Sequence, residues 1–171
     1  MQFMAGGTPR NDVVEFITMA SIGNAIDFGN LTAAGVMLNG GLADTTRACF
    51  AGVNQNPGTN YNTYIDFFTI SSTGNAADFG DLTVARYSMG GASNSVRGTA
   101  AGGASPAQNP IDFIQIATTA NSTDFGDLGS VREGGTGCAN GHGGISLDTF
   151  GSQRPSATYM PGSGRGIAMG G

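Results

Sequence analysis

Short runs that combine apolar and polar residues occur along this chain, and one pattern of this kind occurs three times. In each case an acidic residue precedes an aromatic residue, and further apolar and polar residues follow. The three runs are Glu15-Phe16-Ile17-Thr18-Met19, Asp66-Phe67-Phe68-Thr69-Ile70 and Asp112-Phe113-Ile114-Gln115-Ile116. They predict strands over residues 13–20, 64–71 and 111–117. Because both faces of these strands carry apolar side chains, the pattern is typical of strands buried on both sides, as in sheets stacked face to face.

A second motif follows each of these strands. It recurs with a period of about 50 residues, which is typical of a repeat architecture. Turns at Gly23-Asn24, Gly74-Asn75 and Ala120-Asn121 are expected, because Gly and Asn tolerate positive φ. They lead into the triplets Asp27-Phe28-Gly29, Asp78-Phe79-Gly80 and Asp124-Phe125-Gly126. Phe28, Phe79 and Phe125 each supply one large ring at the same place in the unit, as a repeating core layer requires.

Two further strands complete each unit. A strand ending in glycine opens it, over residues 3–7, 48–52 and 99–103, and a strand of small residues beginning near Ala34, at Arg86 or at Arg132 closes it. Small residues allow neighbouring backbones to approach closely. The sequence therefore predicts a single all-β domain over residues 1–171, with repeats at approximately 3–47, 48–98 and 99–144. An abbreviated fourth repeat covers 145–171, in which residues 154–171 match 86–103 without a gap.

The order of these strands resembles the kelch repeat of β-propeller proteins. That repeat has a strand ending in Gly-Gly, a strand with an acid before an aromatic, an aromatic strand, and an Arg that leads back to the next Gly-Gly. Phe28, Phe79 and Phe125 stand where it usually has Trp, and Ala51-Gly52 departs from the doubled glycine. The resemblance implies kelch-like β-propeller blades, three full four-stranded repeats plus an abbreviated fourth.

The amino-acid sequence of the motif is also similar to repeats in structural proteins of marine bacteriophages, cyanophages especially. The segment that carries this likeness is Gly74-Asn75-Ala76-Ala77-Asp78-Phe79-Gly80-Asp81-Leu82-Thr83. The resemblance as a whole covers about residues 3 to 149. It implies a virion structural protein that acts as a capsid decoration or an appendage component, located in the virion and in contact with other virion proteins.

Charge and composition narrow the classes of partner. The 171 residues include 30 glycines and carry a net charge of −5, and all seven basic residues are Arg. No stripe of basic residues interleaved with aromatics occurs, so nucleic-acid binding is not expected. No apolar run approaches the ~20 residues of a membrane-spanning helix, so no membrane contact is expected. The N-terminal residues lack the basic start and apolar core of a signal peptide.

Recurrence of the charged residues favours structural roles over catalysis. A catalytic pair of carboxylates is needed once, whereas these acids and arginines recur from unit to unit. We expect Asp–Arg or Asp–backbone bonds that tie the strands of a unit together, and no enzymatic activity. The structural set, besides the three phenylalanines, is Asp27, Asp78, Asp124, Arg86, Arg97, Arg132, Arg154 and Arg165.

Metal and cofactor sites are not expected. Asp78 with Asp81, or Asp124 with Asp127, would supply hard oxygens for calcium, but the spacing is not that of an EF-hand loop and Asn30 breaks the pattern in the first unit. His142 is the single histidine and the two cysteines lie far apart, so no zinc or copper site of the usual composition can be assembled. We expect Cys49 and Cys138 to be small buried thiols, with a disulfide between them as the alternative.

The longest variable loop suggests an alternative function. It spans residues 53–63 and is rich in Asn, with two tyrosines in or beside it. Tyr and Asn displayed on a rigid β scaffold can bind sugars or a protein partner. The alternative is therefore a carbohydrate-binding adhesin or tail-fibre receptor-binding module that uses Tyr61, Tyr64, Asn60 and Asn62 to hold a glycan.

The number of units predicts an incomplete core. Propellers typically need at least ~4 blades to close, and three units with a fraction of a fourth leave sheet faces or edges that proteins normally cover. We expect the chain to complete its core against another copy of itself, as a homo-oligomer, or against another protein. The alternatives are a tight, imperfect four-unit monomer or a chain cut from a longer one. The expected interface comprises residues 3–7, 166–171 and the abbreviated unit over 146–160.

Overall fold

The computed structural model describes residues 1–7, 9–35, 41–56, 60–104, 106–139 and 166–169. Within these residues every regular element is a β-strand and none is a helix. The all-β prediction is thereby confirmed for the described part of the chain. The strands are β1 (Gln2–Ala5), β2 (Asn11–Ile17), β3 (Ile26–Gly35), β4 (Leu42–Ala43), β5 (Arg47–Asn56), β6 (Asn60–Thr69), β7 (Ala77–Asp81), β8 (Gly90–Ser93), β9 (Arg97–Ala101), β10 (Gln108–Gln115), β11 (Thr123–Arg132), β12 (Thr136–Ala139) and β13 (Gly166–Met169).

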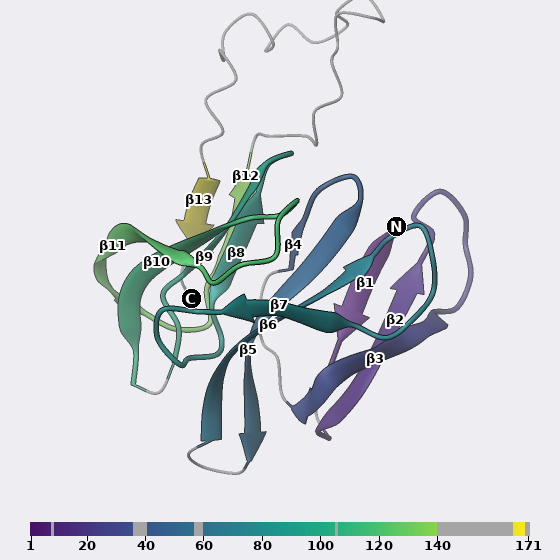
Figure 1. The fold of residues 1–171 in the computed structure, drawn as a ribbon, viewed down its shortest axis with the longest axis horizontal. Helices are drawn as coiled ribbons and strands as arrows, with labels where there is room; N and C mark the ends of the chain where they lie inside the picture. Colours follow the sequence, from purple (N-terminus) through teal and green to yellow (C-terminus); the bar gives the residue numbers. More distant parts are fainter. Residues whose placement is uncertain (8, 36–40, 57–59, 105, 140–165, 170–171) are drawn as a thin grey trace, which may run out of the picture.

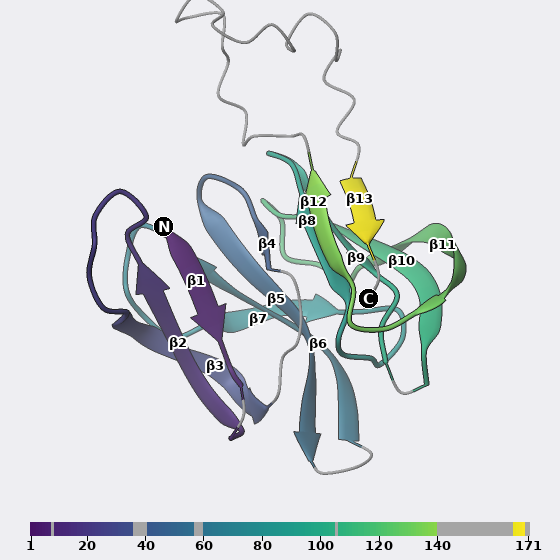
Figure 2. The same cartoon turned by 180° about the vertical axis from the view of Figure 1, so that it is seen from behind.

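These strands form four antiparallel sheets that follow one another along the chain (Figures 1 and 2). The first sheet has the order β1-β2-β3, the second β4-β5-β6-β7, the third β8-β9-β10-β11 and the fourth β12-β13. The strand of small residues does not pair within its own sequence unit. It pairs with the glycine-ended strand of the next unit, as in Leu42↔Cys49 and Ala92↔Thr99. Each full sheet is therefore offset by one strand from the sequence repeat.

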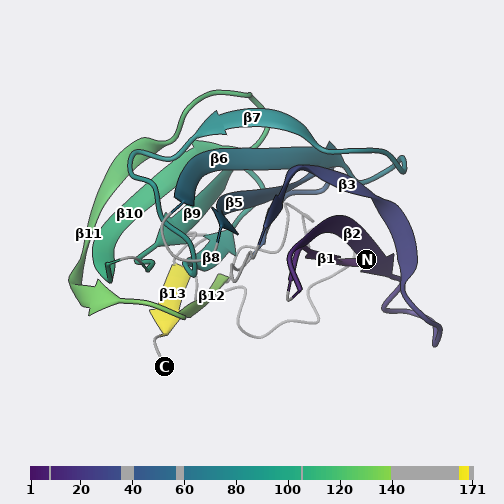
Figure 3. The ribbon, with the colours of Figure 1, turned by 90° about the horizontal axis from the view of Figure 1, so that it is seen from below.

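The sheets stack as successive layers, and their side chains form two apolar clusters (Figure 3). The cluster between the first and second sheets includes Phe28, Phe50 and Phe68. The cluster between the second and third sheets includes Phe79 and Ile114. Because alternate residues of β5 and β6 enter different clusters, the second sheet is buried on both faces. This confirms the prediction of a strand buried on both sides for residues 64–71, whereas for residues 13–20 it was wrong, because Val13, Glu15 and Met19 are exposed.

The Asp-Phe-Gly triplets mark the places where one sheet receives the turn of the next. Gly29 and Gly80 have φ of +152° and +144°, in a region that L side chains rarely adopt. A Cβ atom at Gly29 would overlap the carbonyl of Gly74, and one at Gly80 would lie 2.5 Å from the carbonyl oxygen of Ala120. Glycine is therefore needed twice over, for its backbone conformation and for the close approach of the following unit's turn.

Hydrogen bonds hold the turns of the second and third units in place. The Asn75 side-chain Oδ1 accepts from the Asn30 N–H at 3.0 Å, and the Gly74 N–H donates to the Phe28 carbonyl at 2.8 Å. The next pair of sheets repeats the arrangement, since Asn121 Oδ1 accepts from the Asp81 N–H at 3.1 Å. The turn Asn of one unit thus binds the third strand of the preceding unit, and this contact occurs twice among the described residues.

The third triplet does not share this environment. Phe28 and Phe79 are buried, with 4% and 3% of their surface exposed, whereas Phe125 is 58% exposed. A Cβ atom at Gly126 would meet nothing within 4 Å, although its φ of +133° resembles those of the other two glycines. The expectation of a ring in the core at every unit was wrong for Phe125, because no turn or sheet among the described residues covers β11.

Gly80→Ala will therefore destabilise the protein more than Gly126→Ala. Both substitutions place an L residue at positive φ, at a shared cost of about 1–3 kcal/mol. Only Gly80→Ala also pushes away the turn at Ala120, which breaks hydrogen bonds worth about 1 kcal/mol each. We expect a further loss of about 1–3 kcal/mol in the free energy of unfolding, measured by urea denaturation. Equal losses for the two variants would contradict this account of the contact.

The sequence-based loop at residues 53–63 is largely strand. β5 and β6 continue through it as a long hairpin, with the cross-strand pairs Val53↔Asn62 and Asn54↔Tyr61 (Figure 1). Asn-rich composition favoured a loop, but side-chain packing decided otherwise, because Val53 is buried and Tyr61 stacks on Tyr87. The expected loop was thus wrong for the described residues of both strands.

Candidate functional site

The recurring acid of the second strand in each unit forms a joint between sheets. The carboxylate of Asp66 accepts from the Thr32 N–H at 2.8 Å and from the Thr32 hydroxyl at 2.6 Å. Asp112 accepts in the same way from the N–H and hydroxyl of Thr83, at 2.9 and 2.7 Å. In each case the acid belongs to one sheet, and the threonine lies in the last strand of the preceding sheet (Thr32) or just after it (Thr83), so we call this contact the acid joint.

Arg86 reinforces the second acid joint. Its guanidinium Nη2 lies 3.3 Å from Asp112 Oδ2, and both side chains are almost fully buried. The same Nη2 donates to the Ala100 carbonyl at 3.3 Å, and Nε donates to the Met89 sulfur at 3.0 Å. The expected Asp–Arg bond therefore exists, but it was placed wrongly. Arg86 lies in the segment between β7 and β8, so the bond joins two sequence units and does not tie the strands of one unit.

Burial shapes the titration of these groups. Removal from water raises the pKa of the Asp66 carboxyl, and the hydrogen bonds from Thr32 oppose that rise. Removal from water lowers the pKa of Arg86, and the charge of Asp112 opposes that fall. Arg86 Nη1 is buried without a hydrogen-bond partner among the described residues. Hydrogen bonds from Thr32 thus offset the desolvation cost of Asp66, and the ion pair with Asp112 offsets that of Arg86.

The other recurring charges have local roles. Asp27, Asp78 and Asp124 each accept from the N–H of the glycine two residues later, at 3.2, 3.1 and 2.9 Å. These bonds fix the bend before each glycine and do not reach another strand. Arg97 lies over the Phe113 ring at 4.9 Å, as Arg47 lies over Phe67 at 4.7 Å. Arg132 is exposed, and Arg154, Arg165 and His142 lie outside the described residues.

The residues expected to hold a glycan come from one strand, β6, but do not share a face. Successive side chains alternate along a strand, so Tyr61 lies opposite Asn62 and Tyr64. One face of the Tyr61 ring is covered by Tyr87, with the two rings parallel to within 5° and 5.2 Å apart. Tyr64 is exposed and Asn62 Nδ2 is buried without a hydrogen-bond partner among the described residues. Of Asn60 only the backbone pairing with Asn56 is described. A glycan site here stays a prediction, and Tyr87 is the neighbour that the candidate set missed.

The described residues give no centre for a metal ion. No group of three or more His, Cys, Asp or Glu side chains lies together among them. Asp81, one of the candidate calcium ligands, accepts instead from the Thr63 hydroxyl at 2.6 Å. None of the described elements is a helix of the length and apolarity that crossing a membrane requires.

The two cysteines are free and differ in environment. Cys49 is fully buried in β5, whereas Cys138 is exposed in β12. The expectation of two buried thiols was therefore wrong for Cys138, because β12 belongs to the two-stranded fourth sheet, which covers less of its strands. Burial raises the pKa of the Cys49 thiol to about 12.

Iodoacetamide will consequently label Cys138 in the native protein and leave Cys49 unmodified. The thiolate is the reactive form, and Cys49 is both inaccessible and protonated at neutral pH. Intact-mass spectrometry should show one adduct in buffer and two in denaturant, with peptide mapping to assign them. Two adducts in buffer would show that Cys49 is not held in the core.

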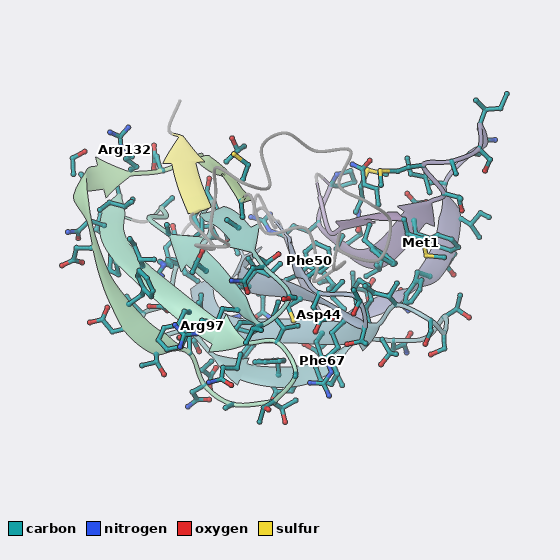
Figure 4. The ribbon with its side chains drawn as sticks, turned by 90° about the horizontal axis from the view of Figure 1, so that it is seen from above. Met1, Asp44, Phe50, Phe67, Arg97 and Arg132 are labelled. Atoms are coloured by element: carbon teal, nitrogen blue, oxygen red, sulfur yellow. The ribbon has the colours of Figure 1, made fainter. Side chains whose placement is uncertain are left out.

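Among the described residues, two sheet faces carry exposed side chains at opposite ends of the stack, although β12 of the fourth sheet packs against β8 of the third sheet. We call the outer surface of the first sheet, with Met4, Glu15 and Met19, the head face. We call the outer surface of the third sheet, with Phe125 and the exposed Arg132, the tail face. Met4 is 46% exposed and Met19 70%, although their counterparts in the third sheet, Ala100 and Ile116, are buried. Figure 4 places Arg132 and Met1 at opposite sides of the molecule.

Comparison with known proteins adds no family to this description. A scan against protein-family models found no match, and a search of the curated proteins found no relative.

Proposed function

We propose that this protein is a non-enzymatic structural protein of a bacteriophage virion, a capsid decoration or appendage component that acts as an assembly module. The observation that carries the proposal is the pair of uncovered faces. Each face presents side chains whose counterparts are buried elsewhere in the same chain, as Phe125 does relative to Phe79. The equivalent side chains in the other sheets are buried between layers. A face that exposes such side chains is typical of an interaction surface.

The chemistry of the described residues is consistent with a structural role. The acids that recur in the sequence are used by the scaffold, since Asp66 and Asp112 bind threonines and Asp78 binds the backbone of its own strand. The buried cation Arg86 is paired with Asp112. These groups hold sheets together, and their geometry leaves no pair of carboxylates free to act on a substrate within that set.

The finer architecture that we propose is that of kelch-like propeller blades. In the second and third sheets the chain runs through four adjacent strands in order and then passes to the next sheet. That path is the path of a propeller blade. The first sheet has three described strands and the fourth has two, so each is a partial blade.

The virion setting rests on the resemblance of the repeats to marine phage structural proteins. It is tested by raising an antibody against the purified protein and labelling purified marine phage particles in the electron microscope. Labelling at regular positions, with a fixed copy number per particle by quantitative mass spectrometry, is the expected result. Absence from particles whose genome encodes the chain would overturn the proposal.

A further inference from the structure

We infer that the partner of the head face is the tail face of a second copy of this chain. The two copies would meet head to tail and repeat between molecules the contact that the sheets already make within one molecule. This inference rests on the proposed function, because it names the partner of the same uncovered faces. Three observations carry it: the charges, the turn and the apolar side chains of the two faces.

The charges of the two faces match those of the internal acid joint. Cross-strand pairing assigns the equivalent positions, since Glu15, Asp66 and Asp112 lie opposite Asp27, Asp78 and Asp124 respectively. Arg132 follows Phe125 by seven residues, as Arg86 follows Phe79. Inside the molecule Arg86 pairs with Asp112 at 3.3 Å. Arg132 of one copy and Glu15 of its neighbour are the exposed members of the same pair, with opposite charge.

The turn of the first unit is available for the tail face. Gly23 and Asn24 are exposed, and Ile22 beside them is fully exposed. Their counterparts Asn75 and Asn121 bind the backbone of the preceding sheet, the latter at Asp81. The matching backbone on the tail face is that of Asp127, beside the open space at Gly126. The neighbour's Asn24 would therefore accept from the Asp127 N–H.

Apolar side chains complete the match. The ring centroids of Phe28 and Phe68 lie 4.9 Å apart, and Phe68 comes from the next sheet. Phe79 shares a buried cluster with Ile114 of the next sheet. In the first sheet Ile17 stands at the position of Phe68 and Ile114. On the tail face Phe125 stands at the position of Phe28 and Phe79. One difference is that Gly129 stands where Thr32 and Thr83 stand. The joint between copies would thus lack the threonine hydroxyl and keep the backbone N–H.

One strand of the chain already lies where the neighbour must bind. β13 pairs with β12 through Cys138↔Ile167, as β5 pairs with β4 through Leu42↔Cys49. In the first sheet of the neighbour, β1 holds the place that β5 holds in the second sheet. β13 and the neighbour's β1 cannot both occupy this position beside β12. Docking therefore requires that β1 replace β13, which completes a four-stranded sheet from two copies.

The contact joins two different surfaces, so each copy keeps one free face of each kind. Heterologous contacts of this kind produce rings when the rotation closes and filaments when it does not. The full chain is thus expected to show association that grows with protein concentration in sedimentation velocity.

Charge reversal tests the pairing. Arg132→Glu or Glu15→Arg alone places like charges together, and we expect association to weaken about tenfold or more. The double variant restores opposite charges and should regain association. Thr45→Arg, in an exposed turn of the second sheet, is the control and should leave association unchanged. Association that ignores the single reversals, or a double variant that stays dissociated, would overturn the inference.

Proline substitution tests the exchange of strands. Successive N–H groups point to opposite sides of a strand, so one of the two prolines in Ile167→Pro/Ala168→Pro removes a bond from β13 to β12. Freeing β12 should strengthen association severalfold over that of the natural chain. If the natural chain and this variant both remain monomeric, self-docking is wrong. The proposed function is judged separately, because labelling of particles does not depend on contact between copies.

Discussion

Asp112→Ala is expected to lower the free energy of unfolding by about 3–5 kcal/mol, the usual cost of removing one partner of a buried ion pair. The Arg86 guanidinium would remain buried without its counter-charge. The Thr83 N–H and hydroxyl, together with the Ser122 hydroxyl that donates to Asp112 at 3.0 Å, would lose their acceptor. Urea denaturation followed by circular dichroism measures the loss as a shift of the midpoint.

Glu15→Ala provides the matched control, because Glu15 occupies the same place in the first sheet and is exposed. Its effect should stay within about 0.5 kcal/mol, as for most surface substitutions. Arg86→Met added to Asp112→Ala should recover part of the lost stability, since an apolar pair avoids the unpaired buried charge. If Asp112→Ala and Glu15→Ala cost the same, the acid joint contributes nothing specific to the stack.

Phe79→Ala is expected to cost about 3–5 kcal/mol, as for other buried phenylalanines. The Phe79 ring is 3% exposed and is packed between the second and third sheets. Phe125→Ala removes the same ring from the same place in the repeat, where it is 58% exposed. We expect that variant to cost only about 0.5–1.5 kcal/mol, through loss of the ring–ring pair with Phe113.

The comparison is well matched because each ring makes the same contact within its own sheet. Phe79 packs edge to face on Phe67 at 5.8 Å, and Phe125 packs edge to face on Phe113 at 6.0 Å. The difference between the two variants therefore reports the contribution of the following sheet alone. Thermal unfolding of monomeric protein at low concentration gives the measurement. Equal destabilisation would mean that the sheets stack without cooperating.

The apolar strands and the burial of the second sheet could be predicted from the sequence because their signal is local. A doubly apolar strand such as 64–71 must be covered on both sides, and Gly80 after Phe79 marks a backbone that only glycine adopts readily. The partner of Arg86 could not be predicted in this way. A repeat shows which residues are equivalent, but whether Arg86 meets an acid of its own unit or the next depends on how the sheets stack.

Two other errors had the same origin in tertiary structure. Residues 53–63 carry the composition of a loop, yet burial of Val53 and the stack of Tyr61 on Tyr87 hold them in a hairpin. Phe125 carries the signal of a core residue and is exposed because nothing described lies above it. The virion role and the glycan alternative depend on partners outside the chain, so both stay predictions.

The directional contact between neighbouring sheets has a consequence for evolution. Each unit offers an Asn turn on one side and accepts one on the other, through Asn75 on Asn30 and Asn121 on Asp81. A tandem duplication of one unit would therefore insert a new layer without redesigning either flanking layer, because the Asn side-chain oxygen of the added turn would meet a backbone N–H donor on the layer before it. A chain lengthened or shortened by one whole unit would thus keep the same contact between its neighbouring layers.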